Sequence, residues 1–182
     1  MNGQNYTQKS LEAVRDAQTL AAQYGNQQIE QGHLLMALLQ AENGLVPQLL
    51  SNMGLTVESF SAAVRAQVEK LPKVSGPGRE AGKVYVSQGV DKALNTAEDT
   101  ARQMKDEYVS VEHLLLGLVK VPDRELGETY RTYRVTEEGI LQALSTVRGS
   151  QRVTSDNPEE TYDALKKYGS DLVERARQNK LD

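Results

Sequence analysis

Gly32-His33-Leu34-Leu35-Met36-Ala37-Leu38-Leu39 is the stretch that decides the fold, because a similar stretch, Glu112-His113-Leu114-Leu115-Leu116-Gly117-Leu118-Val119, follows eighty residues later. Similarity at a fixed offset is the signature of a repeat architecture. The same offset relates further identical pairs on both sides, including Gln8/Gln88, Ala17/Ala97, Ala21/Ala101, Thr56/Thr136 and Ala63/Ala143. The sequence therefore predicts a domain over 1–148 with two copies of one unit, at about 5–71 and 85–148, joined by a connector over 72–84.

Each copy is predicted to form four helices, so the expected fold is all-α. Thr7, Thr56, Ser87, Ser110 and Thr136 are candidate N-caps, each followed by apolar residues at helical spacing. One unit cannot bury its apolar face alone, so the two should pack about a pseudo-two-fold axis. The third helix of the second copy is expected around 125–133, and Val84–Val86 should be extended. Residues expected to face the core include Leu11, Val14, Leu34, Leu38, Phe60, Val64, Val90, Leu94, Ile140, Leu141 and Leu144.

Composition and charge exclude several classes of function. The chain has no Cys, which excludes disulfides and thiolate metal sites. A net charge of −4 gives no basic footprint for nucleic acid. The N-terminus lacks the apolar core of a signal peptide, and no apolar run is long enough to span a bilayer. We therefore expect a cytoplasmic protein that binds neither nucleic acid nor membrane.

No motif for catalysis or for a cofactor is visible. The connector glycines Gly76, Gly78 and Gly82 lack the spacing of a phosphate-binding loop, which needs four residues between its glycines and then Lys and Ser or Thr. His33 and His113 occupy equivalent repeat positions; they are either a symmetric metal site or helix-start residues duplicated with the repeat, and the second alternative is favoured because no further ligand is near in sequence. No nucleophile–base pair is recognisable.

Three acidic residues cluster near the predicted start of the second His-Leu-Leu helix: Asp106, Glu107 and Glu112. One interpretation is a small acidic surface patch. The other is favourable interaction of acidic residues with a helix N-terminus, and it carries the greater weight.

The tandem His-Leu-Leu helices resemble the double Clp repeat N-terminal domain. The connector Leu71-Pro72-Lys73-Val74-Ser75-Gly76 is similar to that of the ClpB-type AAA+ disaggregases. The tail carries Asn157-Pro158-Glu159-Glu160-Thr161-Tyr162 and ends in Lys180-Leu181-Asp182, as in the segment that joins this domain to the first ATPase module of that family. The resemblance implies that 149–182 form a flexible linker and a helix, and that the chain is an N-terminal fragment.

What the resemblance implies for function is capture of unfolded or aggregated polypeptide. The parent would be a hexameric ATPase that uses ATP and Mg, threads its substrate and works with an Hsp70 system, while this fragment would be monomeric and hold no cofactor. Polypeptide-binding residues carried over from the family are Thr7, Asp106 and Glu112, with Glu107 as an alternative to Asp106. Tyr85, Leu94 and Tyr108 are expected either to line an adjacent apolar groove or to pack in the core. The alternative function is docking of an adaptor protein, as in ClpA- and ClpC-type unfoldases.

Overall fold

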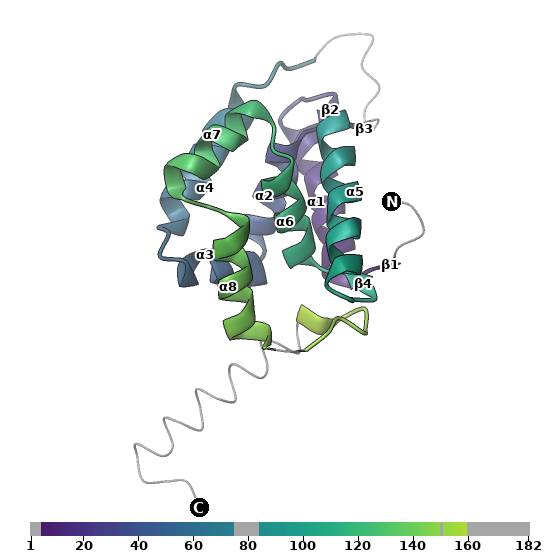
Figure 1. The fold of residues 1–182 in the computed structure, drawn as a ribbon. Coiled ribbons are helices and arrows are strands. Elements are labelled where there is room, and N and C mark those ends of the chain that lie inside the picture. The colour runs from purple at the N-terminus through teal and green to yellow at the C-terminus, as the bar shows by residue number, and fades with distance from the viewer. Residues whose placement is uncertain (1–4, 75–83, 150, 160–182) are drawn as a thin grey trace, which may run out of the picture.

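Eight α-helices and four two-residue strands make up the computed structural model, which describes residues 5–74, 84–149 and 151–159 (Figure 1). The predicted all-α class is confirmed. The helices are α1 (Gln8–Gln23), α2 (Gln31–Gln40), α3 (Leu45–Asn52), α4 (Val57–Glu69), α5 (Gln88–Gln103), α6 (Val111–Lys120), α7 (Arg124–Tyr133) and α8 (Glu137–Arg148). The bounds of α1 and α2 recur in α5 and α6 at the offset of the sequence repeat, and α8 begins at the same offset from α4 but ends one residue earlier.

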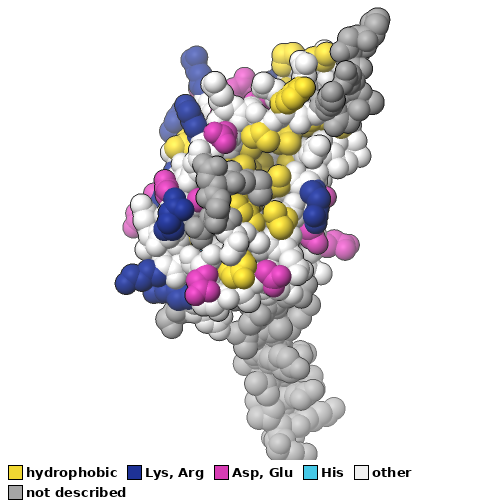
Figure 2. Space-filling view, turned by 90° about the vertical axis from the view of Figure 1, so that its right-hand side faces the viewer, with side chains coloured by type: hydrophobic (Ala, Val, Ile, Leu, Met, Phe, Trp, Pro, Cys, Tyr) yellow, Lys and Arg dark blue, Asp and Glu magenta, His cyan; other side chains and the backbone are white. Residues whose placement is uncertain are grey.

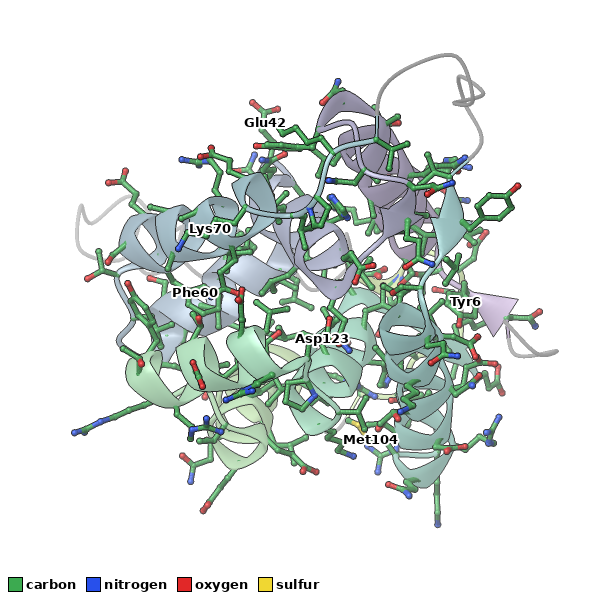
Figure 3. The ribbon with its side chains drawn as sticks, turned by 90° about the horizontal axis from the view of Figure 1, so that it is seen from above. Tyr6, Glu42, Phe60, Lys70, Met104 and Asp123 are labelled. Atoms are coloured by element: carbon green, nitrogen blue, oxygen red, sulfur yellow. The ribbon has the colours of Figure 1, made fainter. Side chains whose placement is uncertain are left out.

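The two His-Leu-Leu helices, α2 and α6, form the centre of the molecule. Residues 31–38 and 111–118 are buried on every side, because α1 packs on α2, α5 packs on α6, and the two central helices also contact each other. The outer helices complete the bundle by pairing across the repeats, α3 with α8 and α4 with α7 (Figure 3). The core is aliphatic apart from Tyr6, Phe60 and Tyr130.

α5 and α6 approach so closely that a side chain has no room between them. A Cβ atom on Gly117 would lie 2.3 Å from the backbone oxygen of Ala93 and 3.1 Å from the backbone nitrogen of Ala97. The equivalent position in the first repeat is Ala37, which is buried but carries a methyl group. The two halves of the pseudo-symmetric bundle are therefore packed differently at this point.

Two short parallel sheets tie the repeats together at their ends. β1 (Asn5–Tyr6) pairs with β4 (Tyr108–Val109), and β2 (Gln28–Ile29) pairs with β3 (Tyr85–Val86). Each sheet thus combines the strand that precedes one repeat with a loop of the other repeat. Only the extended segment at Val84–Val86 was expected, because strands of two residues are too short to show an alternating pattern.

Two residues expected in the core lie at the surface instead. Leu11 and Leu141 are 36% and 38% exposed, so these two predictions were wrong. Their neighbours Ser10 and Ile140 are buried in the same helices, and consecutive helical residues are about 100° apart around the axis. The buried faces are therefore narrower than the apolar stripes in the sequence.

The helix caps follow the sequence at most positions. The side chains of Thr7, Ser87 and Thr136 accept hydrogen bonds from the first turns of α1, α5 and α8, whereas Thr56 makes no such bond. The expected helix after Asn157 is described only as far as Glu159, and residues 75–83 of the connector lie outside the described residues. In the described part of the chain, no helix has the length and apolar character required to cross a membrane.

Candidate functional site

The β1–β4 sheet brings four of the six predicted site residues to one end of the bundle. Thr7 is the N-cap of α1, and its backbone N–H donates to the carbonyl of Val109 at 3.0 Å. Tyr108 lies in β4, Asp106 in the loop before it, and Glu112 in the first turn of α6. The N-termini of α1 and α6 therefore meet at a cluster of polar side chains.

Asp106 is buried at the centre of this cluster. His113 Nε2 donates to its Oδ2 at 2.8 Å, Arg148 pairs with its Oδ1, and the backbone N–H of Val153 donates to the same Oδ1 at 2.9 Å. Burial alone would raise the pKa of Asp106, but the hydrogen bonds from His113, Arg148 and Val153, together with the Arg148 charge, outweigh burial and lower that pKa. Asp106 is therefore a buried carboxylate held in its ionised form.

Glu112 shares Arg148 with Asp106. Arg148 Nη1 donates to Glu112 Oε2 at 3.2 Å, and both side chains are buried. Glu112 Oε1 has no hydrogen-bond partner among the described residues. The interpretation of Asp106 and Glu112 as an acidic surface patch is wrong, because only Glu107 is exposed. Glu112 does lie in the first turn of α6, as the helix-dipole alternative requires.

Thr7 is covered by the segment that follows α8. Its Oγ1 donates to Glu159 Oε2 at 2.7 Å and accepts from the backbone N–H of Ser10 at 3.1 Å. Val111 also donates its backbone N–H to Glu159 Oε2, at 3.3 Å. Burial, and secondarily the charge of Glu112, raise the pKa of Glu159 against the opposing effect of these hydrogen bonds. A third carboxylate thus lies between the two helix N-termini.

The two histidines have the helix-start role. His33 Nδ1 accepts from the backbone N–H of Glu30 at 2.9 Å, which leaves Nε2 to donate to Asn26 Oδ1 at 2.8 Å. His113 repeats this geometry with Ser110 and Asp106. Burial lowers the pKa of His33 to about 4. Both nitrogens of each imidazole ring therefore form hydrogen bonds within the fold.

Within residues 5–74, 84–149 and 151–159, no group of three or more His, Asp or Glu side chains is arranged to hold a metal ion. What the cluster offers chemically is one buried guanidinium and three buried carboxylates at two helix N-termini. Such an arrangement fixes chain segments by charge-assisted hydrogen bonds.

The three expected groove residues do not lie together. Tyr85 belongs to β3, before α5, and Tyr108 to β4, after α5, so about 24 Å of helix separates them. Leu94 is buried in the core, which is the packing alternative of the sequence prediction. Tyr85 is 59% exposed and Tyr108 is half-buried. Whether these residues contact a polypeptide stays a prediction.

Hydrophobic side chains gather on the face that carries α5 and the short strands. Figure 2 shows them as a stripe bordered on both sides by charged side chains. Three of the four large hydrophobic side chains that are exposed in the described residues belong to α1 and β3: Leu11, Tyr85 and Val86. Leu11 lies near the start of α1, whereas Tyr85 and Val86 lie beside its far end, about 18 Å along the helix. The three residues together are called the apolar stripe below.

Sequence reasoning missed three residues of the polar cluster: Arg148, Val153 and Glu159. Glu159 appears there only as part of the tail motif, and Arg148 was not singled out. Thr7 and Glu159 are 152 positions apart in the sequence. Local periodicity carries no information about a contact over that distance, so no signal in the sequence indicated it.

Comparison with known proteins gives one consistent result. The family described as Clp repeat (R) N-terminal domain matches residues 5–133. The chaperone protein ClpB of Nitratidesulfovibrio vulgaris is 48% identical over 178 residues, which is 97% of this chain and 21% of that protein. ClpB of Clostridium perfringens is 37% identical over 183 residues, covering 100% of this chain and 21% of that protein. The chain thus spans about a fifth of the length of these relatives.

Solved structures agree on the fold. The Hsp104 N-terminal domain from Candida albicans superposes with a TM-score of 0.74 at 23% identity, over 86% of this chain and 99% of that one. The N-terminal domain of the ClpV1 ATPase from E. coli EAEC gives a TM-score of 0.65 at 18% identity, over 85% and 91% of the two chains. The family match, the ClpB relatives and this shared fold lead to one conclusion: the chain belongs to the family of Clp repeat N-terminal domains, in the form found in ClpB-type chaperones.

Proposed function

We propose that this domain captures segments of unfolded or aggregated polypeptide on the apolar stripe. The observation that carries the proposal is the concentration of exposed large hydrophobic side chains on α1 and β3, with Leu11, Tyr85 and Val86 at 36%, 59% and 48% exposure. These residues lie on the face where Figure 2 shows hydrophobic side chains bordered by charged ones, and an exposed apolar surface of this kind marks an interaction site. Contacts of this kind select for apolar content and not for a particular sequence, as binding of non-native chains requires.

The remainder of the proposed function concerns a longer protein. As the N-terminal part of a ClpB-type chaperone, the domain would deliver polypeptide to a hexameric AAA+ ATPase that uses ATP and Mg in the cytoplasm and cooperates with an Hsp70 system. The support for this proposal is the identity with ClpB chaperones over 97% of the chain or more. The domain itself would act as a monomer that binds and does not catalyse.

The experiment that tests capture is a titration of the purified chain with a fluorescently labelled, permanently unfolded polypeptide, followed by anisotropy. Leu11→Ser removes an apolar side chain from the stripe. Leu141→Ser is a matched control, because Leu141 is exposed to nearly the same extent, 38% against 36%, but lies on α8. Neither substitution disturbs the core, so stability should change by no more than about 0.5 kcal/mol.

Binding should be weakened by Leu11→Ser, and also by Tyr85→Ser, and should be unchanged by Leu141→Ser. It should depend little on salt, because the contact is apolar. Equal weakening by Leu11→Ser and Leu141→Ser would refute the assignment to the stripe. A stable one-to-one complex with a single folded protein, without binding to the unfolded chain, would refute capture in favour of adaptor docking.

A further inference from the structure

The chain that leaves α8 turns back across the start of the molecule. Residues 151–159, here called the strap, are fixed by backbone hydrogen bonds at two places. Glu107 N–H donates to the carbonyl of Val153 at 2.7 Å, and Gln8 N–H donates to the carbonyl of Asp156 at 2.8 Å. The Val153 N–H donates in return to Asp106, and Val153 is fully buried. The strap therefore crosses the loop before β4 and the first turn of α1.

Arg148 and Glu159 anchor the strap at its two ends. Arg148, the last residue of α8, donates through Nε to the carbonyl of Gln151 at 2.8 Å while its terminal nitrogens pair with Asp106 and Glu112. Glu159 is only 3% exposed and accepts from Thr7 and from the first N–H of α6. A carboxylate is favoured at a helix N-terminus, and here two helices supply it with donors.

The equivalent place in the first repeat is filled in another way. The residue at the position of Val111 is Gln31, whose amide donates to the carbonyls of Gly89 and Val121 and accepts from the N–H of Asp123. Asn26 stands in the place of Asp106 and donates to the carbonyl of Pro72. The side chains of Gln31 and Asn26 are neutral and hydrogen-bonded, with the carboxylates of Glu30 and Asp123 nearby. The second repeat instead uses three carboxylates and one arginine at the same place.

Closing the strap costs electrostatic free energy, because it buries the Glu159 carboxyl group close to Glu112. Burial and the neighbouring Glu112 charge raise the pKa of Glu159. Glu159 Oε1 and Glu112 Oε1 are both buried without a hydrogen-bond partner in the described part of the chain. Two ionised carboxylates in this position would regain water if the strap lifted. A contact with favourable hydrogen bonds and a substantial desolvation cost is suited to open and close.

We propose that the strap opens and closes reversibly, and so holds or releases the chain where it leaves the second repeat. This reversible contact is called the latch below. In this proposal Thr7, Asp106 and Glu112 hold the latch and do not touch bound polypeptide. Thr7 donates a hydrogen bond to the Glu159 carboxylate, and Asp106 accepts one from the Val153 N–H. Glu112 positions Arg148 by accepting from its guanidinium. The latch goes beyond polypeptide capture, because it controls how the following chain leaves the domain.

Amide hydrogen exchange tests the latch directly. The amides of Gln8, Glu107 and Val153 each donate a hydrogen bond that forms only when the strap is in place, so they report its closure. The amide of Val74, bonded to the carbonyl of Gly25 at 2.8 Å, is the reference in the first repeat. Glu159→Ala should accelerate exchange at the three reporters by about tenfold or more, the effect of losing a hydrogen bond to a charged group. Exchange at Val74 should not change.

Thr7→Val should open the latch in the same way, and the chain provides a matched control. Thr7 and Ser87 cap α1 and α5 with identical geometry, each at 3.1 Å from the N–H that it accepts, but only Thr7 touches the strap. Ser87→Ala should therefore leave the three reporters protected, as should Thr7→Ser, which retains the hydroxyl. Reporters that exchange as fast in the parent chain as in Glu159→Ala would overturn the latch.

A double substitution distinguishes an effect of Thr7 through the latch from direct contact of Thr7 with bound polypeptide. If Thr7 acts through the latch, then Thr7→Val has no further effect on unfolded-polypeptide affinity once Glu159→Ala is present. An equal loss of affinity from Thr7→Val in both backgrounds would show direct contact and overturn that part of the proposal. A parent chain that binds no unfolded polypeptide would refute capture, while the exchange experiment would still decide the latch.

Discussion

Gly117→Ala sets helix propensity against packing, and the structure decides which effect is larger. Alanine is favoured over glycine inside a helix by about 1 kcal/mol, so propensity alone predicts a more stable protein. The new Cβ would lie 2.3 Å from the Ala93 oxygen, whereas ordinary contacts begin at 3.4 Å. The obstructing atoms belong to the backbone of α5 and cannot rotate away, so α5 and α6 must separate by about 1 Å.

Overpacking of this kind costs about 1–3 kcal/mol, and the separation also weakens the rest of the α5–α6 interface. We therefore expect Gly117→Ala to lower the free energy of unfolding by up to about 2 kcal/mol after the propensity gain of about 1 kcal/mol is subtracted. Urea denaturation followed by circular dichroism measures it, and the melting temperature should fall by about 2–4 °C for each kcal/mol.

Gly139→Ala is the matched control for this experiment. Its Cβ would meet the flexible end of Met53 at 3.1 Å and the Thr136 side chain at 3.1 Å, with no backbone atom in the way. Its stability should be unchanged or raised by up to about 1 kcal/mol. The reasoning is refuted if Gly117→Ala is as stable as the parent, or if Gly139→Ala is destabilised by the same amount.

Three further predictions concern the core, the surface and pH. Phe60→Ala should lower the free energy of unfolding by about 3–5 kcal/mol, because Phe60 is fully buried against Tyr130 and Tyr133 at ring separations of 6.2 and 5.3 Å; a loss below 1 kcal/mol in urea would contradict this packing. Leu144→Ala should cost about 2–5 kcal/mol and Leu141→Ala under about 0.5 kcal/mol, and equal losses would contradict the assigned orientation of α8. His33 is neutral when folded, with its pKa lowered from 6.5 to about 4 by burial, so the unfolded chain takes up the proton first and stability falls by about 3 kcal/mol from pH 6.5 to pH 4; His33→Gln should remove that part of the slope, and an unaltered pH profile of unfolding would contradict the shift.

The sequence was sufficient for the helical architecture because the information is local and duplicated. Apolar spacing defines each helix, and the constant offset confirms that the same unit is built twice. It was insufficient for the width of the buried faces, as Leu11 and Leu141 demonstrate, since periodicity does not reveal which neighbours cover a helix. Tertiary packing decides that question.

The candidate site was only partly predictable for a related reason. Thr7, Asp106, Tyr108 and Glu112 come together through β1–β4 pairing, which no local pattern indicates. The family resemblance named Thr7, Asp106 and Glu112 but not their partners Arg148 and Glu159, which reach them from the far end of the described chain. Burial of charged groups appears only when the whole fold is assembled.

The exchange of strands between the repeats has a consequence for synthesis on the ribosome. β1 finds its partner only in β4, and the N–H of Thr7 bonds to Val109. The N-terminal residues must therefore wait until the entire first repeat and α5 have emerged, at about 5–20 residues per second. β2 gains its partner when β3 emerges ahead of α5, whereas β1 has no partner until β4 follows α5. During that interval the nascent chain carries an open strand edge at its N-terminus.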